Sequence, residues 1–420
     1  MATLRSRAAA ALLVFAAALA VRLAYVAAHR APAERIGDAQ EYHSYAVSLL
    51  DSGRYEGFNG LRAARMPGYP LFLSALYSVF GRSPLAVQAA QSLLGAGTCV
   101  LILLAAWQWY GPGWGLLAGF LAAGSYDLLS PSALLLSEAP ATFLLTLSFY
   151  LLTRLRPPSL RDCAAAGLCA GAACLVRPEV LPFAFVCAAL AARLGRGLRG
   201  ADRLKGPAVL LGAFFLCLAP WALRNARTIG RPLLTSTAGP YNLYRQGLPR
   251  TVEERLGGVK DFYLAPEGLG ELEKGSAYSD AARRFYLSVD PVLALKAVAI
   301  NIMIFYYPFL PQYDPTLVFL LPWAFWGLWL ARKDDRRWTW AAWAGYLTIL
   351  HCFVAVMDSR YRQALAPSLI LLAVGGLETA RLKLGRRRFT ALAGGWALAN
   401  AAVWALSPSV RILILPFLKS

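Results

Sequence analysis

The chain has 420 residues, of which 58% are hydrophobic and 15% charged, and its mean hydropathy is +0.49. Soluble globular proteins are about 45–50% apolar, and here the excess gathers in runs of membrane-spanning length, so a soluble protein is excluded. The net charge of +19 lies in short basic clusters between these runs. Such clusters are typical of the cytoplasmic loops of membrane proteins and argue against nucleic-acid binding.

Apolar runs along the chain predict about eleven membrane-spanning helices, since a helix needs about 20 apolar residues to cross a bilayer. In chain order the runs lie near residues 8–28, 84–109, 113–130, 139–155, 162–177, 179–194, 206–223, 316–331, 338–357, 363–380 and 389–406. A short apolar tail at 409–418 leaves the number between about ten and thirteen. The predicted fold class is an all-α polytopic membrane protein with further helices along its outer surface.

The basic clusters give the predicted orientation of these helices. If Arg5 and Arg7 lie in the cytoplasm, the alternation of spans places a first external loop, 30–83, outside and the next basic clusters inside. This arrangement agrees with the positive-inside rule. The same alternation places 224–315 outside, where its mixed charges and scattered glycines predict a compact external cap.

One apolar segment, 291–311, tests this orientation. If it crossed the membrane, two strongly basic clusters further along the chain would lie outside, against the positive-inside rule. We therefore expect an interfacial helix there, lying on the outer surface. Residues 316–420 then form the C-terminal membrane helices, and the whole chain, 1–420, is predicted to be a single membrane domain.

The first external loop contains a predicted amphipathic helix at 38–52. Asp38, Glu41 and Tyr42 share one face of that helix because they are three and four residues apart, whereas His43 points away from them. Asp38 is ionised at neutral pH and can accept the proton of an acceptor hydroxyl. It can also cap the helix that it begins, with Glu41 completing a capping box. Both interpretations stay open at this point, and they are compatible.

A second acid, Glu138, lies in the segment Ser137-Glu-Ala-Pro at the outer junction of two predicted spans. This pattern is typical of a helix N-terminus, where negative charge is favoured. The functional interpretation is a second carboxylate that faces the same external cavity as Asp38.

Arginines of the outer loops form a third group of candidates. An arginine binds phosphate through two parallel charge-assisted hydrogen bonds, which suits a lipid phosphate. Arginines at membrane edges also reach the phosphates of bulk lipid without any specific ligand. The external arginines are Arg65, Arg177, Arg224, Arg227, Arg245, Arg360 and Arg362.

Aromatic residues and metal ligands give weaker signals. Tyr241 is a candidate for stacking on a sugar, although tyrosines also gather at membrane interfaces without a ligand. The chain has no His and Cys spacing typical of zinc, and no metal site is assigned. Acidic groups can hold a divalent cation or act alone, so a divalent cation stays open and no other cofactor is predicted.

Short segments along residues 38–362 together resemble the GT-C membrane glycosyltransferases, specifically the bacterial relatives of the protein O-mannosyltransferases and of the lipid A aminoarabinose transferase. The segments occur in the order of that family. They are Asp38-Ala-Gln-Glu-Tyr-His, Arg65-Met-Pro-Gly-Tyr-Pro-Leu-Phe, Leu136-Ser-Glu-Ala-Pro-Ala-Thr-Phe, Val176-Arg-Pro-Glu, Pro220-Trp-Ala-Leu-Arg-Asn, Gly239-Pro-Tyr-Asn-Leu-Tyr and Ser359-Arg-Tyr-Arg.

The resemblance implies an inverting transfer of a sugar from a polyprenyl-phosphate donor to a lipid, glycan or protein acceptor. Asp38 matches the catalytic base of the family, and Glu138 matches an acidic position in the second outer loop. The residues expected to bind the donor phosphate are Arg65, Arg177, Arg360 and Arg362. The residues expected to line the substrate pocket are Tyr42, His43, Tyr69 and Tyr241.

With this resemblance we expect a multi-pass protein of the bacterial cytoplasmic (inner) membrane, surrounded by membrane lipids, with its active site facing the periplasm. The competing hypothesis is a transporter or flippase of a polyprenyl-linked glycan, which would bind similar lipids. Transporters usually carry ionisable groups or broken helices near the bilayer midplane. Here most charges lie in loops or near the ends of the predicted spans, which favours an enzyme.

Overall fold

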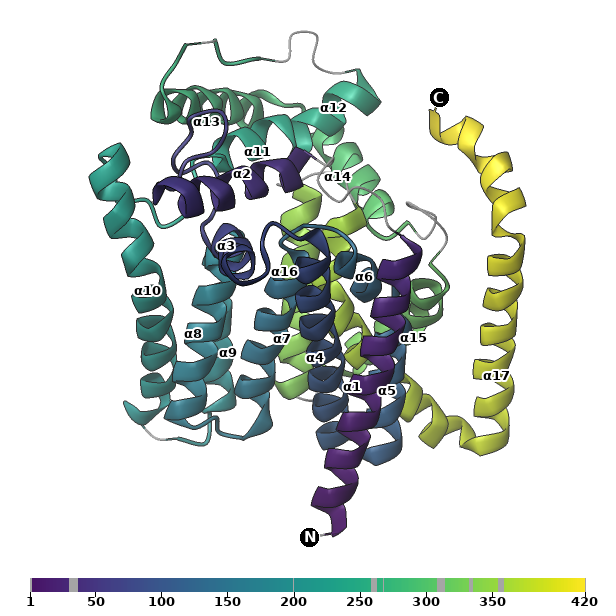
Figure 1. The fold of residues 1–420 in the computed structure, drawn as a ribbon. Coiled ribbons are helices and arrows are strands. Elements are labelled where there is room, and N and C mark those ends of the chain that lie inside the picture. The colour runs from purple at the N-terminus through teal and green to yellow at the C-terminus, as the bar shows by residue number, and fades with distance from the viewer. Residues whose placement is uncertain are drawn as a thin grey trace.

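The computed structural model describes residues 2–29, 37–198, 200–257, 263–266, 268–307, 314–331, 335–353 and 359–419. Within these ranges the chain is helical and contains no strand, so the predicted all-α fold class is confirmed. Long helices run side by side in a bundle, and shorter helices lie across one end of it (Figure 1).

The bundle helices begin and end close to the predicted apolar runs. They are α1 (Ala2–Ala28), α4 (Pro84–Tyr110), α5 (Pro112–Gly124), α7 (Glu138–Arg154), α8 (Leu160–Val176), α9 (Val180–Leu194), α10 (Asp202–Ile229), α15 (Pro315–Ala331), α16 (Asp335–Phe353) and α17 (Ala366–Lys419). The last two predicted runs, apart from residues 363–365, and the tail at 409–418 fall within α17, which bends at Gly385. Gly385 has a φ of 72°, a conformation that glycine adopts readily and that interrupts the helix. Residues 354–357 of one predicted run lie outside the described residues.

Fewer described helices are long and apolar enough to span a membrane than the sequence predicts. Four described helices are long and apolar enough to cross a membrane, or up to five if the bent pair α13 (Glu271–Ser288) and α14 (Pro291–Phe305) counts as one span. Helix α5 has 13 residues and α9 has 15. At 1.5 Å per residue they reach about 20–23 Å, short of a hydrocarbon core of about 30 Å. The figure of eleven spans is therefore not confirmed.

Short helices form the end of the molecule opposite the N-terminus (Figure 1). In addition to α13 and α14 they are α2 (Gly37–Ser52), α3 (Gly68–Phe80), α11 (Gly239–Arg245) and α12 (Leu248–Leu256). The α13 and α14 axes meet at 112°, so this pair is not a straight membrane-spanning helix. Residues 308–311 of the predicted interfacial helix lie outside the described residues.

Aromatic packing fills the centre of the bundle below these short helices. Phe149 of α7 stacks on Trp343 of α16, with ring centroids 4.6 Å apart, and also contacts Trp340 at 5.4 Å. Both tryptophans are fully buried. These large rings hold α7 and α16 together, and the segments that leave the upper ends of the two helices carry residues of the site described next.

Candidate active site

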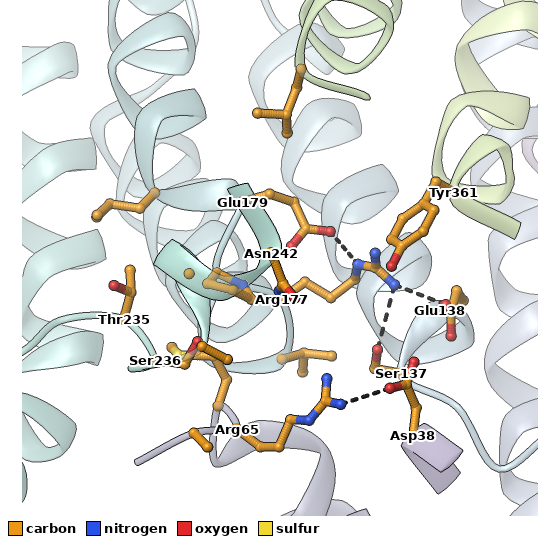
Figure 2. A pocket seen from close by; sticks show the side chains of 18 of the residues that line it. Asp38, Arg65, Ser137, Glu138, Arg177, Glu179, Thr235, Ser236, Asn242 and Tyr361 are labelled. Atoms are coloured by element: carbon orange, nitrogen blue, oxygen red, sulfur yellow. Dashed lines mark hydrogen bonds and ion pairs between the residues drawn. The ribbon is translucent and has the colours of Figure 1, made fainter. Parts of the chain in front are cut away.

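A cavity of about 330 Å³ lies where the short helices meet the bundle, a volume within the range of small-molecule sites. Segments far apart in sequence line it: the loop after α2, the start of α7, the α8–α9 turn, the residues before α11, and α16 (Figure 2). Its polar lining residues include Asp38, Tyr42, Arg65, Ser137, Glu138, Arg177, Glu179, Thr235, Ser236, Asn242, His351 and Tyr361.

Asp38, in the first turn of α2, is held between two arginines. One carboxylate oxygen accepts a hydrogen bond from Arg65 Nη2 at 2.7 Å, and the other lies 2.7 Å from Arg360 Nη2. Burial opposes ionisation of Asp38, but the charges of Arg65 and Arg360 outweigh it and lower the pKa of this carboxyl group below its usual value. Asp38 is therefore a carboxylate at neutral pH.

The same geometry answers the question of helix capping at α2. Arg65 Nε donates to Glu41 at 2.6 Å, so one guanidinium joins both acids that the sequence offers as a capping box. Among the described residues, neither carboxylate accepts a hydrogen bond from a backbone amide of the helix. Long-range ion pairs thus replace the local capping bonds.

Arg177, at the end of α8, joins two further acids. Its Nη1 lies 3.0 Å from Glu138, and its Nε donates to Glu179 (Figure 2). The guanidinium also lies over the ring of Tyr361 at 5.1 Å, and Arg360 lies 5.3 Å from that ring. Tyr361 therefore contacts both arginines and links the Asp38 pair to the Glu138 pair.

One carboxylate oxygen of Glu138 is without a hydrogen-bond partner in the described part of the chain. Its Oε1 pairs with Arg177, while Oε2 is buried and has no hydrogen-bond partner among the described residues. The N-cap residue of α7, Ser137, makes no side-chain capping bond. A buried acceptor without a donor costs free energy, so Oε2 on the cavity wall is suited to a ligand that brings an O–H or N–H group.

The comparisons with known proteins point to one fold. No protein-family model matches the chain, and no curated protein matches it in sequence. The solved structure of ArnT from Cupriavidus metallidurans bound to undecaprenyl phosphate matches 98% of this chain and 72% of ArnT, at 14% identity and a TM-score of 0.53. The chain has the GT-C fold.

A second solved structure is similar over most of this chain. It is the archaeal oligosaccharyltransferase AglB from Archaeoglobus fulgidus in complex with an inhibitory peptide and a dolichol-phosphate. The match covers 96% of this chain and 54% of AglB, at 13% identity and a TM-score of 0.48. The chain thus spans about half the length of AglB.

Within the GT-C fold, the cavity brings together half of the residues predicted from the sequence. Asp38, Tyr42, Arg65, Glu138 and Arg177 line it directly. Arg360 reaches it through its ion pair with Asp38.

Four predicted site residues lie elsewhere in the GT-C fold. Arg362 is fully buried and pairs with Asp127 of α6 (Tyr126–Leu129) instead of facing the cavity. Tyr69 is buried and donates to Gln91 at 2.8 Å, and His43 hydrogen-bonds Tyr77 at 3.0 Å. Tyr241 is 38% exposed and packs edge-on against a tyrosine of α13.

Sequence reasoning missed several lining residues, among them Glu179, His351 and Tyr361. Glu179 and Tyr361 lie inside segments that carry the family resemblance, so the signal was present but was attributed to their arginine neighbours. His351 gave no signal, because it is one histidine in an apolar run that becomes α16. Its Nδ1 is buried without a partner among the described residues.

A metal site was left open by the sequence. Across the described ranges of the chain, no group of three or more Asp, Glu, His or Cys side chains is placed to hold a metal ion.

Proposed function

We propose that this chain is an inverting glycosyltransferase of the bacterial cytoplasmic membrane. It moves a sugar from a polyprenyl-phosphate donor to a lipid, glycan or protein acceptor on the periplasmic face. One observation carries the proposal: a single cavity of a GT-C fold joins Asp38 and Glu138 to the guanidinium groups of Arg65 and Arg177. The undecaprenyl phosphate bound to ArnT supports a lipid-linked donor.

The donor phosphate is assigned to the arginines around Asp38. Arg65 uses Nε and Nη2 for Glu41 and Asp38, whereas Nη1 makes no hydrogen bond to the described part of the chain. This nitrogen supplies two further N–H donors to a phosphate, and Arg360 adds positive charge on the other side of Asp38. A phosphate that draws these arginines away from Asp38 raises the basicity of the carboxylate.

The chemistry then follows from the positions of the charges. Asp38 accepts the proton of an acceptor hydroxyl as its oxygen bonds to C1 of the sugar on the face opposite the phosphate. The bond from C1 to the phosphate oxygen breaks, the configuration at C1 inverts, and the arginines stabilise the charge on the departing polyprenyl phosphate. Glu138 Oε2 accepts a hydrogen bond from a hydroxyl group of the substrate, which provides its missing partner.

Each part of the chain has a role in this proposal. The first external loop, 30–83, carries the base, and the external cap, 224–315, forms the opposite wall of the cavity. Residues 316–420 add the C-terminal membrane helices to the same single domain.

The test compares Asp38→Asn with wild type in lipid, using a panel of radiolabelled polyprenyl-phosphate sugars. We expect consumption of one donor by the wild type and a fall of about 100-fold or more in the variant. Asp51→Asn is the matched control, because Asp51 lies on the same helix but is exposed and pairs with Arg82 at 2.6 Å. Unchanged turnover in Asp38→Asn would overturn the assignment. Movement of labelled lipid across the bilayer without transfer would support the transporter instead.

A further inference from the structure

The two outer walls of the cavity meet at one carboxylate outside it. The first wall is the segment 62–66, in which Ala64, Arg65 and Met66 line the cavity. The second is the cap segment 235–239, in which every residue except Thr237 lines it. Glu271, the first residue of α13, does not line the cavity but hydrogen-bonds both segments.

Glu271 accepts three hydrogen bonds with its two carboxylate oxygens. The amide of Arg62 donates to Oε2 at 2.8 Å, and the amide of Ala63 donates to Oε1 at 2.9 Å. The hydroxyl of Thr237 also donates to Oε1. A direct bond between the walls lies beside them, from the Thr237 amide to the Ala63 carbonyl at 2.9 Å.

The carbonyl groups of the first wall are held from the other side. Arg224 of α10 donates to the carbonyl of Arg62 at 2.6 Å and to that of Tyr55 at 2.8 Å. The hydroxyl of Tyr55 lies 3.1 Å from the Arg65 carbonyl and 3.0 Å from the Met66 carbonyl. Glu271 thus ties this otherwise anchored segment to the cap, next to the direct bond between Thr237 and Ala63.

We propose that Glu271 is a positioning residue that fixes the spacing of the two cavity walls and thereby holds Arg65 for the donor phosphate. The inference rests on the proposed function of the cavity. Charge-assisted bonds to backbone amides are directional and stronger than neutral ones, so one carboxylate sets the position of both segments. Without it, Arg65 loses part of the support that holds it against Asp38.

The chemistry of the side chain makes the inference testable with small changes. Glu271→Gln keeps the shape but replaces one acceptor oxygen with an NH2 group, which donates only and cannot serve a backbone amide. Thr237→Val keeps the shape and removes only the bond to the second wall. Glu273→Gln is the matched control, because Glu273 lies in the same first turn of α13 but accepts from the amide of Gly270, outside the cavity walls.

The experiment measures amide hydrogen exchange and donor kinetics on the full chain in lipid. We expect faster exchange of a peptide covering residues 55–66 in Glu271→Gln, and a rise of about tenfold in the KM for the polyprenyl-phosphate sugar. The value of kcat should change less, and Thr237→Val should shift KM in the same direction. Glu271→Asp, which keeps both acceptor oxygens, should recover part of the loss, and Glu273→Gln should leave exchange and KM unchanged.

Two results would overturn the inference. Unchanged exchange in 55–66 would mean that Glu271 does not hold the wall, and faster exchange with an unaltered KM would mean that its role is only structural. Failure of the proposed function gives a different result, namely no donor turnover by the wild type. The exchange difference between Glu271→Gln and Glu273→Gln does not depend on turnover.

Discussion

Replacing Arg362 with glutamine should destabilise the protein, although the resemblance to GT-C enzymes assigns this arginine to the donor phosphate. Its side chain is fully buried. Nε and Nη2 donate to the two oxygens of Asp127 at 2.8 and 3.1 Å, and Nη1 donates to the carbonyls of Phe305 and Tyr307. One side chain therefore links η3 (Ser359–Leu365) to α6 and to the end of α14.

The expected magnitude follows from burial. Removing one partner of a buried ion pair leaves the other charge without compensation and costs about 3–5 kcal/mol. Solvent does not reduce this figure, because the side-chain exposures of Arg362 and Asp127 are 0% and 6%. Asp127→Asn added to Arg362→Gln removes the stranded charge and should recover about 2 kcal/mol.

The assay is unfolding in mixed detergent micelles, followed by tryptophan fluorescence, for the wild type, both single variants and the double variant. Donor KM is measured on the same preparations. The reasoning is refuted if Arg362→Gln unfolds at the same detergent fraction as wild type while its donor KM rises, since that pattern belongs to a ligand-binding arginine. It is also refuted if the two single effects simply add.

Three further predictions concern charge and packing. Burial, assisted by the charge of Asp127, raises the pKa of Asp314 to about 6, so the folded state binds the proton more tightly and wild-type stability falls as pH rises from about 4 to 6. Asp314→Asn keeps the side-chain oxygen that accepts from the amides of Thr316 and Leu317 at the start of α15. The variant should lack this pH dependence of stability and should be more stable than wild type at pH 7.5, by up to about 3 kcal/mol in a denaturation titration. Arg360→Gln removes a charge that lowers the pKa of Asp38, so the acid limb of the kcat/KM profile should move to higher pH. Gly327→Ala places a Cβ against the backbone carbonyl of Leu372 in α17, closer than van der Waals contact allows, so α15 and α17 must separate and unfolding should be easier by about 1–3 kcal/mol.

Each of these three predictions has an outcome that would contradict it. An Asp314→Asn protein with the wild-type pH slope would show that another group titrates there. An acid limb that does not move in Arg360→Gln would remove Asp38 as the group whose ionisation limits the rate. For the glycine, the control is Gly345→Ala in α16, where a Cβ has no neighbour within 4 Å. Equal stability of the two alanine variants would rule out close packing of α15 on α17.

The sequence by itself determined where most helices of this protein lie, because helix formation depends on residues that are close together in the chain. Apolar runs bounded by prolines, glycines and basic clusters predict where α4 and α8 begin and end to within two residues. Helix α10 extends beyond its predicted run, 206–223, at both ends. The glycine that breaks α17 lies between two of the predicted runs for the same reason. The number of spans could not be settled in this way, because several of these helices are shorter than a bilayer is thick.

Only the tertiary structure decided which charged residues act together. Arg360 and Arg362 are two positions apart in one motif, and a 3₁₀-helix turns by about 120° per residue, so their side chains leave η3 in different directions. One reaches Asp38 and the other reaches Asp127. Glu271 shows the same limit, because its amide partners are more than 200 residues away in the chain. Hydrophobic periodicity is a local property that repeats within a few turns of helix. The partner of a charged side chain depends instead on how distant segments pack.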